Sequence, residues 1–229
     1  MVTMTTASRK AERSRDRELC CLIGRHGAMS VEQVMAAMDC GRTVTYDRVA
    51  RCVEGGLIER VAIPGVSSTV LCASAAGLRY ARLGLPVAKV SATNIEHLLR
   101  CTDAAIRVEK KLCPERLLTE REIRLGEQIE ERPIASVQIG MFQGRPKMHR
   151  ADLAWENTEG KLIAVEVELT AKSPARLRRI ITAWAGAVRK GRLAGVHYLC
   201  EPGQTYRAVE RAIASAHAKD AVGLLEVAG

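Results

Sequence analysis

The first ninety residues show a helical period of apolar positions three times, followed by a strand pattern. Three apolar groups predict three helices: Leu19, Leu22 and Ile23; Val31, Val34, Met35 and Met38; and Val49, Cys52 and Val53. Ser30 and Gln33 have the spacing of a capping box at the start of the second helix. Two β-prone runs, 57–63 and 69–72, flank a Pro-Gly turn and predict a hairpin, and a helix over 75–83 follows. Three helices and a hairpin are the elements of a winged helix-turn-helix.

The third helix, over 44–54, supplies the candidate DNA contacts. In this fold the last helix enters the major groove, where such side chains read base edges or hold phosphates. The residues expected on its outer side are Arg42, Thr45, Tyr46, Arg48 and Arg51. The alternative is that they form an ordinary solvated face, since winged helices also serve as protein-interaction modules.

Residues 91–229 alternate helical and strand patterns, which predicts helices around a mixed sheet. Helices are expected over 93–112, 174–189 and 203–219, and strands over 117–125, 149–155, 162–169, 196–200 and 222–227. The segment 126–147 is polar and punctuated by Gly and Pro, so most of it is predicted to be loop. The fold class is therefore α+β: a winged helix followed by an α/β domain.

A turn sequence, Asn157-Thr158-Glu159-Gly160, joins two alternating strands and sets their register. If Asn157 pairs with Lys161, Asp152 lies opposite Glu166 and Arg150 lies opposite Glu168. The other face then carries only apolar side chains: Leu153, Trp155, Ile163, Val165 and Val167. Three carboxylates, Asp152, Glu166 and Glu168, thus share one face of the sheet.

Neighbouring carboxylates repel one another unless a positive group joins them. One reading is a divalent metal site, since such hard oxygen ligands suit Mg²⁺ or Mn²⁺, which can hold phosphate and activate water. The other is an ion-pair network neutralised by Arg150, Lys172 or an arginine of the next helix. On the helix 174–189, basic side chains near both ends could follow a nucleic-acid backbone.

Composition narrows the function classes. The 229 residues are 47% hydrophobic, which is typical of a folded domain, and only 3% aromatic, which disfavours stacking on single strands. The 35 basic and 26 acidic residues give a net charge of +9, which favours a polyanionic partner. No run is apolar enough for a membrane span or a signal peptide, so we expect a cytoplasmic protein with its eight cysteines reduced. Cysteine and histidine spacings do not predict zinc.

The segments LCASAAGLRYA, HRADLAW and KLIAVEVELTAKSPARLRRIITAW resemble the replication-relaxation family of plasmid and conjugative-element proteins. Glu166, Glu168, Thr170 and Lys172 match its strongest motif, whereas Ala151 departs from the usual proline. The second domain also resembles the PD-(D/E)xK nuclease core. That resemblance implies metal-binding acids at Asp152 and Glu166, Glu168 in the place of the catalytic lysine, and Lys172 as its substitute. Glu109 and Glu120 are further candidates for the remaining acidic position.

We therefore expect three segments: a flexible basic arm over 1–17, a winged helix-turn-helix over 18–90 and a nuclease-like domain over 91–229. The leading hypothesis is a protein of a plasmid or mobile element that binds duplex DNA during replication, relaxation or transfer. Other replication or transfer proteins, or a second copy of the chain, are its expected partners. The alternatives are a metal-dependent endonuclease using Asp152, Glu166, Glu168 and Lys172, and an adaptor that contacts proteins only.

Overall fold

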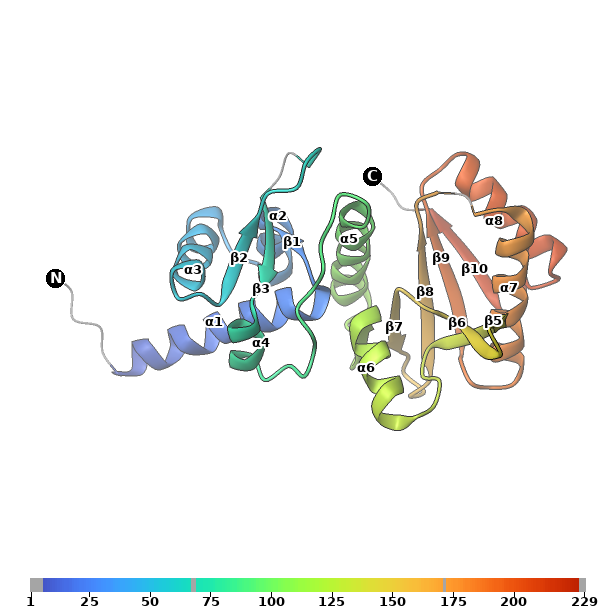
Figure 1. The fold of residues 1–229 in the computed structure, drawn as a ribbon, viewed down its shortest axis with the longest axis horizontal. Coiled ribbons are helices and arrows are strands. Elements are labelled where there is room, and N and C mark those ends of the chain that lie inside the picture. Colours follow the sequence, from blue (N-terminus) through green and yellow to red (C-terminus); the bar gives the residue numbers. More distant parts are fainter. Residues whose placement is uncertain (1–5, 67–68, 171, 227–229) are drawn as a thin grey trace. The chain divides into compact units, whose positions relative to one another are not determined.

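The computed structural model describes residues 6–66, 69–170 and 172–226. It is an α+β structure with two compact units, Met1–Ile106 and Arg107–Gly229 (Figure 1). The division lies later than the boundary at residue 90 expected from the sequence. The described residues form eight helices, and none of these is both long and apolar enough to cross a membrane.

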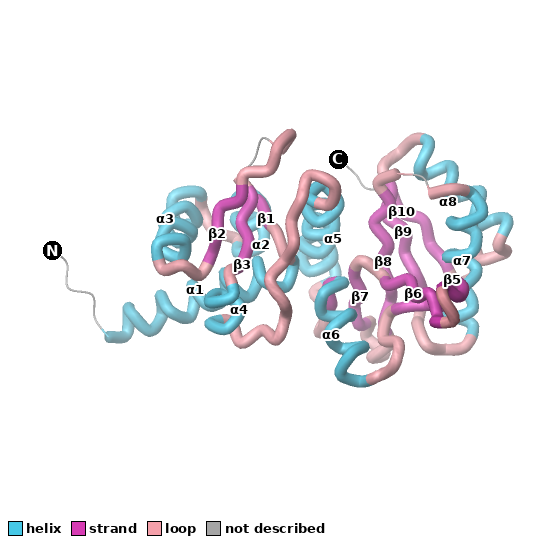
Figure 2. The backbone as a smooth tube through the Cα atoms, in the orientation of Figure 1, coloured by secondary structure: helices cyan, strands magenta, loops and turns pink. Residues whose placement is uncertain are grey.

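The first unit consists of helices and short strands, coloured separately in Figure 2. Its elements are α1 (Thr6–His26), β1 (Met29–Ser30), α2 (Val31–Met38), α3 (Arg42–Glu54), β2 (Ile58–Val61), β3 (Val70–Ala73), α4 (Ala75–Tyr80) and the first part of α5 (Ile95–Leu112). Because α1 begins at Thr6, the prediction of a flexible arm is wrong for residues 6–17. Residues 1–5 and the hairpin tip at 67–68 lie outside the described residues.

The three strands form an antiparallel sheet in the order β1-β3-β2. Ser30 caps α2 through the predicted box, since its side chain accepts from the Gln33 N–H and the Gln33 side chain accepts from the Ser30 N–H. The helices close over a core that contains Leu19, Ile23, Val49, Ile58 and Leu71. The predicted helices and hairpin of this region are therefore present.

Helix α5 explains why the boundary lies at Ile106. Its Ile95 is buried with residues of the strands, and its Ile106 joins the core of the first unit. The side-chain nitrogen Nε2 of Gln33 on α2 also donates to Asp103 Oδ1 at 2.7 Å and to the Leu99 carbonyl at 2.8 Å. Residues 95–106 of the helix thus belong to the first unit rather than to the second.

The second unit is built on a five-stranded mixed sheet in the order β10-β9-β8-β7-β4. Its elements after α5 are β4 (Leu117–Thr119), α6 (Glu120–Glu130), β5 (Ser136–Phe142), β6 (Arg145–Arg150), β7 (Leu153–Glu156), β8 (Leu162–Glu168), α7 (Pro174–Arg189), β9 (Gly195–Cys200), α8 (Gln204–Ser215) and β10 (Val222–Glu226). Strands β4, β7 and β8 are antiparallel, whereas β8, β9 and β10 are parallel. Helix α7 is the crossover between β8 and β9.

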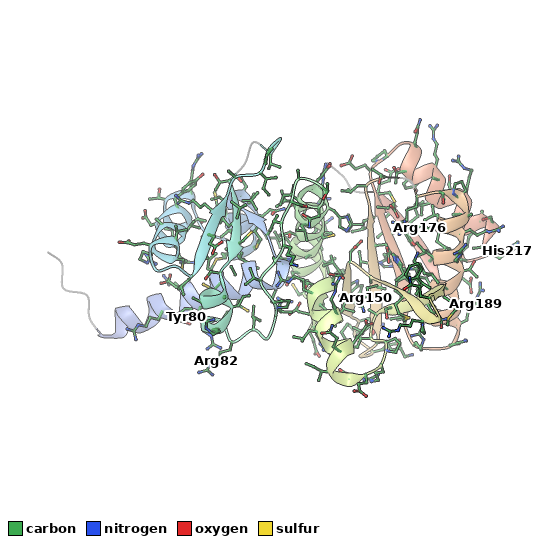
Figure 3. All side chains as sticks on the ribbon, viewed as in Figure 1. Tyr80, Arg82, Arg150, Arg176, Arg189 and His217 are labelled. Atoms are coloured by element: carbon green, nitrogen blue, oxygen red, sulfur yellow. The ribbon has the colours of Figure 1, made fainter. Side chains whose placement is uncertain are left out.

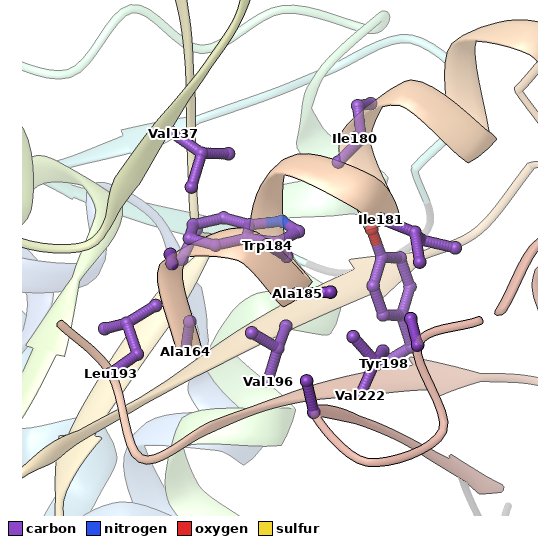
Figure 4. Packing of buried hydrophobic residues seen from close by; sticks show 14 of the residues in the cluster. Val137, Ala164, Ile180, Ile181, Trp184, Ala185, Leu193, Val196, Tyr198 and Val222 are labelled. Carbon is purple, nitrogen blue, oxygen red and sulfur yellow. The ribbon is translucent and has the colours of Figure 1, made fainter. Parts of the chain in front are cut away.

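The core of this unit lies between the sheet and α7. Trp184, Ile180 and Ile181 of α7 are buried in one cluster with Val196 and Tyr198 of β9 (Figure 4). This packing determines which face of the sheet is buried. The residues of β8 that share a face with Ala164 point toward α7. Glu166 and Glu168 are on that face.

Three sequence-based expectations for this unit are wrong. The strand expected over 117–125 ends at Thr119, where a Thr119–Glu122 capping box begins α6. The strand expected over 149–155 is two strands, because Arg150 pairs with Ser136 of β5 and only Leu153 onward pairs with β8. The expected loop over 126–147 contains the end of α6 (126–130), all of β5 and the first part of β6.

Candidate functional site

Arg42, Val44 and Tyr46 are exposed residues in the first turn and a half of α3. The guanidinium of Arg42 lies 5.5 Å from the ring centroid of Tyr46, in a cation–π arrangement. Tyr46 is 38% exposed and Val44 is 50% exposed. This first turn and a half therefore presents a cation, a phenol and an apolar side chain to solvent.

Thr45 and Arg48 are not among these exposed residues, contrary to the sequence-based placement. Thr45 is buried and its hydroxyl donates to the Gly41 carbonyl at 3.1 Å. Arg48 is 5% exposed, and its Nη1 contacts Met38 Sδ at 3.7 Å and Cys40 Sγ at 3.9 Å. The buried face of α3 thus includes Thr45 and Arg48 as well as its aliphatic residues. Arg48 contacts the turn before the helix.

Arg51 is exposed, but its guanidinium already has an acidic partner within the unit. Its Nη2 lies 3.1 Å from Asp16 Oδ1 on α1, with 43% of the Arg51 side chain exposed. An exposed pair of this kind is weak, so Arg51 can exchange Asp16 for another anion at little cost. Of the five predicted contacts, Arg42, Tyr46 and Arg51 remain accessible.

The carboxylates of the second unit form a cluster that we call the carboxylate cluster: Asp152, Glu166 and Glu168. Glu166 is 2% exposed, and two ring nitrogens lie within hydrogen-bond distance of its carboxylate. Trp184 Nε1 donates to Oε1 at 3.1 Å, and His149 Nε2 lies 3.0 Å from Oε1 and 3.1 Å from Oε2. Burial raises the pKa of Glu166 above the ordinary carboxyl value, and hydrogen bonding with His149 offsets part of that rise.

The other two carboxylates are also held by the chain. Asp152 Oδ2 accepts from the Val167 N–H at 2.7 Å, which turns this carboxylate onto the backbone of β8. Glu168 is 4% exposed and forms an ion pair with Lys172. The charges of Asp152 and Lys172 both act on the pKa of Glu166, so the structure brings all four predicted site residues together.

Tyr198 adds a buried hydroxyl to the carboxylate cluster. It pairs with Glu166 in the parallel register of β8 and β9, its side chain is fully buried, and its hydroxyl has no hydrogen-bond partner in the described part of the chain. Burial raises the pKa of Tyr198 well above its ordinary value, and the charges of Glu166, Glu168 and Asp152 raise it further. Alternation on the strand 196–200 could have indicated Tyr198. On a single strand 149–155 alternation places His149 on the face opposite Asp152, so it could not have indicated His149. Trp184 carries only the signal of a core position.

The remaining candidates lie elsewhere. Arg150, expected opposite Glu168, is bound through Nε to Glu127 Oε2 on α6 at 2.7 Å (it is labelled in Figure 3). Glu120 lies in the first turn of α6 with Arg124 as its partner, and Glu109 lies on α5. Glu120 is therefore paired within its own helix.

The carboxylate cluster is a poor fit for hydrated Mg²⁺ or Mn²⁺. Mg²⁺ keeps several waters in an octahedral shell, which requires open space and free carboxylate oxygens. Here both oxygens of Glu166 face ring nitrogens, Glu168 faces Lys172, and the two glutamates are almost inaccessible. The carboxylate cluster therefore lies in a network of ion pairs and hydrogen bonds in this structure, and a metal there stays a prediction from the sequence.

The chain matches no protein-family model, no curated protein and no solved structure.

Proposed function

We propose that the protein binds duplex DNA through the first unit, with α3 as the recognition helix of a winged helix-turn-helix. The observation that supports this proposal is the order α1, β1, α2, α3, β2, β3 combined with the β1-β3-β2 sheet, as expected for a winged helix-turn-helix. Arg42 and Tyr46, which are exposed on α3, supply the contacts. Arg51 can join them when it exchanges Asp16 for a phosphate. The net charge of +9 favours the same partner.

The biological setting proposed is replication, relaxation or transfer of a plasmid or other mobile element in the cytoplasm. It rests on the resemblance of the segments around Ala75, His149 and Glu166 to the replication-relaxation family. In this proposal the second unit is a PD-(D/E)xK-like domain that acts as a scaffold. Its buried Glu166 joins β6, β8 and α7 through His149 and Trp184 instead of holding a metal.

DNA binding is tested on the full chain with a labelled random-sequence duplex, by fluorescence anisotropy across a salt series. Arg42→Ala should weaken binding several-fold and lower the magnitude of the slope of log K against log salt by about 1, as the loss of one phosphate contact does. Arg124→Ala on α6 is the matched control, since it removes an exposed arginine from the other unit. Equal affinity and slope for the two variants would remove α3 from the interface. Failure of every duplex to bind at physiological salt would instead support the adaptor hypothesis.

The endonuclease hypothesis is tested in the same preparation. Supercoiled plasmid is incubated with the protein in Mg²⁺ or Mn²⁺, with the wild type run beside Glu166→Ala. Because the carboxylate cluster is closed, we expect a band shift without nicking from the wild type. Nicking that disappears in Glu166→Ala would show that the cluster opens and binds metal, and would replace the scaffold role with an enzymatic one.

A further inference from the structure

The β5–β6 hairpin is a tight ribbon with a two-residue turn. Phe142 pairs with Arg145, and the two residues between them, Gln143 and Gly144, have φ values of 48° and 75°. Two successive positive φ values are the requirement of a type I′ turn, which glycine meets without strain. The turn therefore holds Phe142 and Arg145 side by side at the end of the ribbon.

The base of this hairpin is fixed and its tip is open. Val137 and Ile139 of β5 are buried in the core of the second unit, where Figure 4 shows Val137 beside the indole of Trp184. Met141 is 60% exposed and Phe142, the single phenylalanine of the chain, is 64% exposed. A rigid base thus presents two large apolar side chains to solvent.

The surroundings of the tip are basic. Arg145 and Lys147 of β6 are exposed and line an open hollow with Phe142. The neighbouring helix α7 packs against β5, and its Arg179 lies close to Gly140. No aspartate or glutamate occurs over 133–151 or over 169–200, the segments that contain the hairpin and α7.

Protection of a sheet edge accounts for only part of this pattern. Charged residues and proline on an outer strand prevent pairing with other chains, which explains Arg145, Pro146 and Lys147. Edge protection would select against Met141 and Phe142 at the tip, since exposed apolar side chains promote association. An apolar tip between cations fits a partner with a polyanionic surface and an apolar interior, and stacked base pairs between two phosphate backbones have that chemistry.

We propose that the β5–β6 hairpin is a DNA-bending wedge, in which Phe142 inserts between base pairs from the minor groove while Arg145 and Lys147 hold flanking phosphates. Side chains such as Phe and Met open base steps in this way and kink the duplex, and the bend brings more phosphate to the protein. The inference rests on the proposed function because both require binding to duplex DNA. It adds a second contact surface and a change in DNA shape.

The test measures bending with a duplex of about 30 base pairs that carries a donor and an acceptor dye at its ends, bound by the full chain. Wild type should raise energy transfer, and Phe142→Ala should remove at least half of that rise. Ile129→Ala is the matched control, because it removes an apolar side chain that is 73% exposed on α6. Both side chains are exposed, so the two variants should fold, and a thermal melt checks this.

The phosphate contacts have their own test. The double variant Arg145→Ala/Lys147→Ala should lower the magnitude of the salt slope by about 2, whereas Lys161→Ala, an exposed lysine at the β7–β8 turn, should leave it unchanged. An unchanged slope in the double variant would overturn the assignment of these two contacts.

The two proposals fail in distinguishable ways. Equal energy transfer in wild type, Phe142→Ala and Ile129→Ala, together with weakened binding by Arg42→Ala, would overturn the wedge alone. Loss of bending in Phe142→Ala with no effect of Arg42→Ala would support the wedge and overturn the role of α3. A wild-type protein that binds no duplex would overturn both, and a protein partner would then be the occupant of the tip.

Discussion

His149 Nε2 lies 3.0 Å from one oxygen of Glu166 and 3.1 Å from the other, so a ring from β6 covers the carboxylate of the central strand β8. The His149 ring also meets Trp184 edge-on, with ring centroids 6.0 Å apart. The hairpin strand and the crossover helix α7 are therefore joined through a single buried carboxylate.

This relationship predicts how stability depends on pH. The folded-state pKa of Glu166 is raised by burial, so its contribution to stability is fully present below the ordinary value of 4.5 and is lost as pH rises through the folded pKa. Gln does not titrate. Glu166→Gln should therefore gain stability relative to wild type as pH rises from below 4.5 to neutrality.

Urea unfolding followed by tryptophan fluorescence measures this difference, because both tryptophans, Trp155 and Trp184, lie in the second unit. The groups that act on Glu166 are His149 of β6, Asp152 before β7 and Lys172 before α7. Glu159→Gln at the β7–β8 turn is the control, since its carboxylate is exposed. Parallel pH curves for wild type and Glu166→Gln would contradict the prediction.

The buried guanidinium of Arg48 predicts opposite effects of two substitutions. Arg48→Met keeps the length of the side chain and removes a buried charge whose Nε has no hydrogen-bond partner in the described structure, so stability should be unchanged or higher. Arg48→Ala leaves a cavity and should cost about 2–5 kcal/mol, as large-to-small core changes do. Calorimetry of both variants beside Arg51→Met, on the exposed side of α3, decides the matter. Similar unfolding temperatures for Arg48→Ala and Arg51→Met would place Arg48 outside the core.

Two helical glycines should respond oppositely to alanine. A Cβ on Gly77 of α4 would lie 2.0 Å from the Leu57 carbonyl oxygen, so the backbones must separate, and Gly77→Ala should destabilise by about 3 kcal/mol. A Cβ on Gly186 of α7 would meet nothing within 4 Å, and Gly186→Ala should stabilise by about 0.5–1 kcal/mol. Thermal unfolding of the two variants shows the sign of each effect. A stable Gly77→Ala would mean that α4 does not approach Leu57 so closely.

The cysteines should differ widely in reactivity. Cys113 is exposed, whereas Cys200 of β9 is buried and burial raises its pKa to about 12. Iodoacetamide at mildly alkaline pH should alkylate Cys113 at least about ten times faster, because the thiolate is the nucleophile. Peptide mapping of the native protein over time measures both rates, and unfolding should make them similar. Equal rates in the native state would show that β9 opens to solvent.

The alternation over 149–155 predicts the register of β7 and β8 correctly, but it wrongly predicts a single strand. Leu153 pairs with Val165 and Trp155 with Ile163, as the Asn157–Gly160 turn indicates. The chain changes partner just before this, since the Ala151 N–H donates to the Ala135 carbonyl at 3.0 Å. Alternation is the same in one strand and in two strands joined by a bend, so the period could not reveal the change.

Local signals compete around Leu117. The capping box at Ser30 and Gln33 recurs at Thr119 and Glu122, but the alternation around Leu117 favours a longer strand. The burial of Glu166 could not be predicted from the sequence, for a different reason. Which face of β8 the crossover helix covers is decided by long-range packing, and Trp184 supplies both the apolar surface and the N–H that a buried carboxylate needs.

Helix α5 has a consequence for how such proteins can be recombined. The unit boundary falls within a continuous helix, and Ile95 and Ile106, both on the first-unit side of that boundary, complete the cores of the first unit. A gene fusion joined at residue 90 would leave the apolar surface around Val70 uncovered. It would also carry α5 into the new protein without the core residues that its apolar side packs against. Exchange of either half between lineages therefore has to take place after Ile106, or bring α5 along with the first unit.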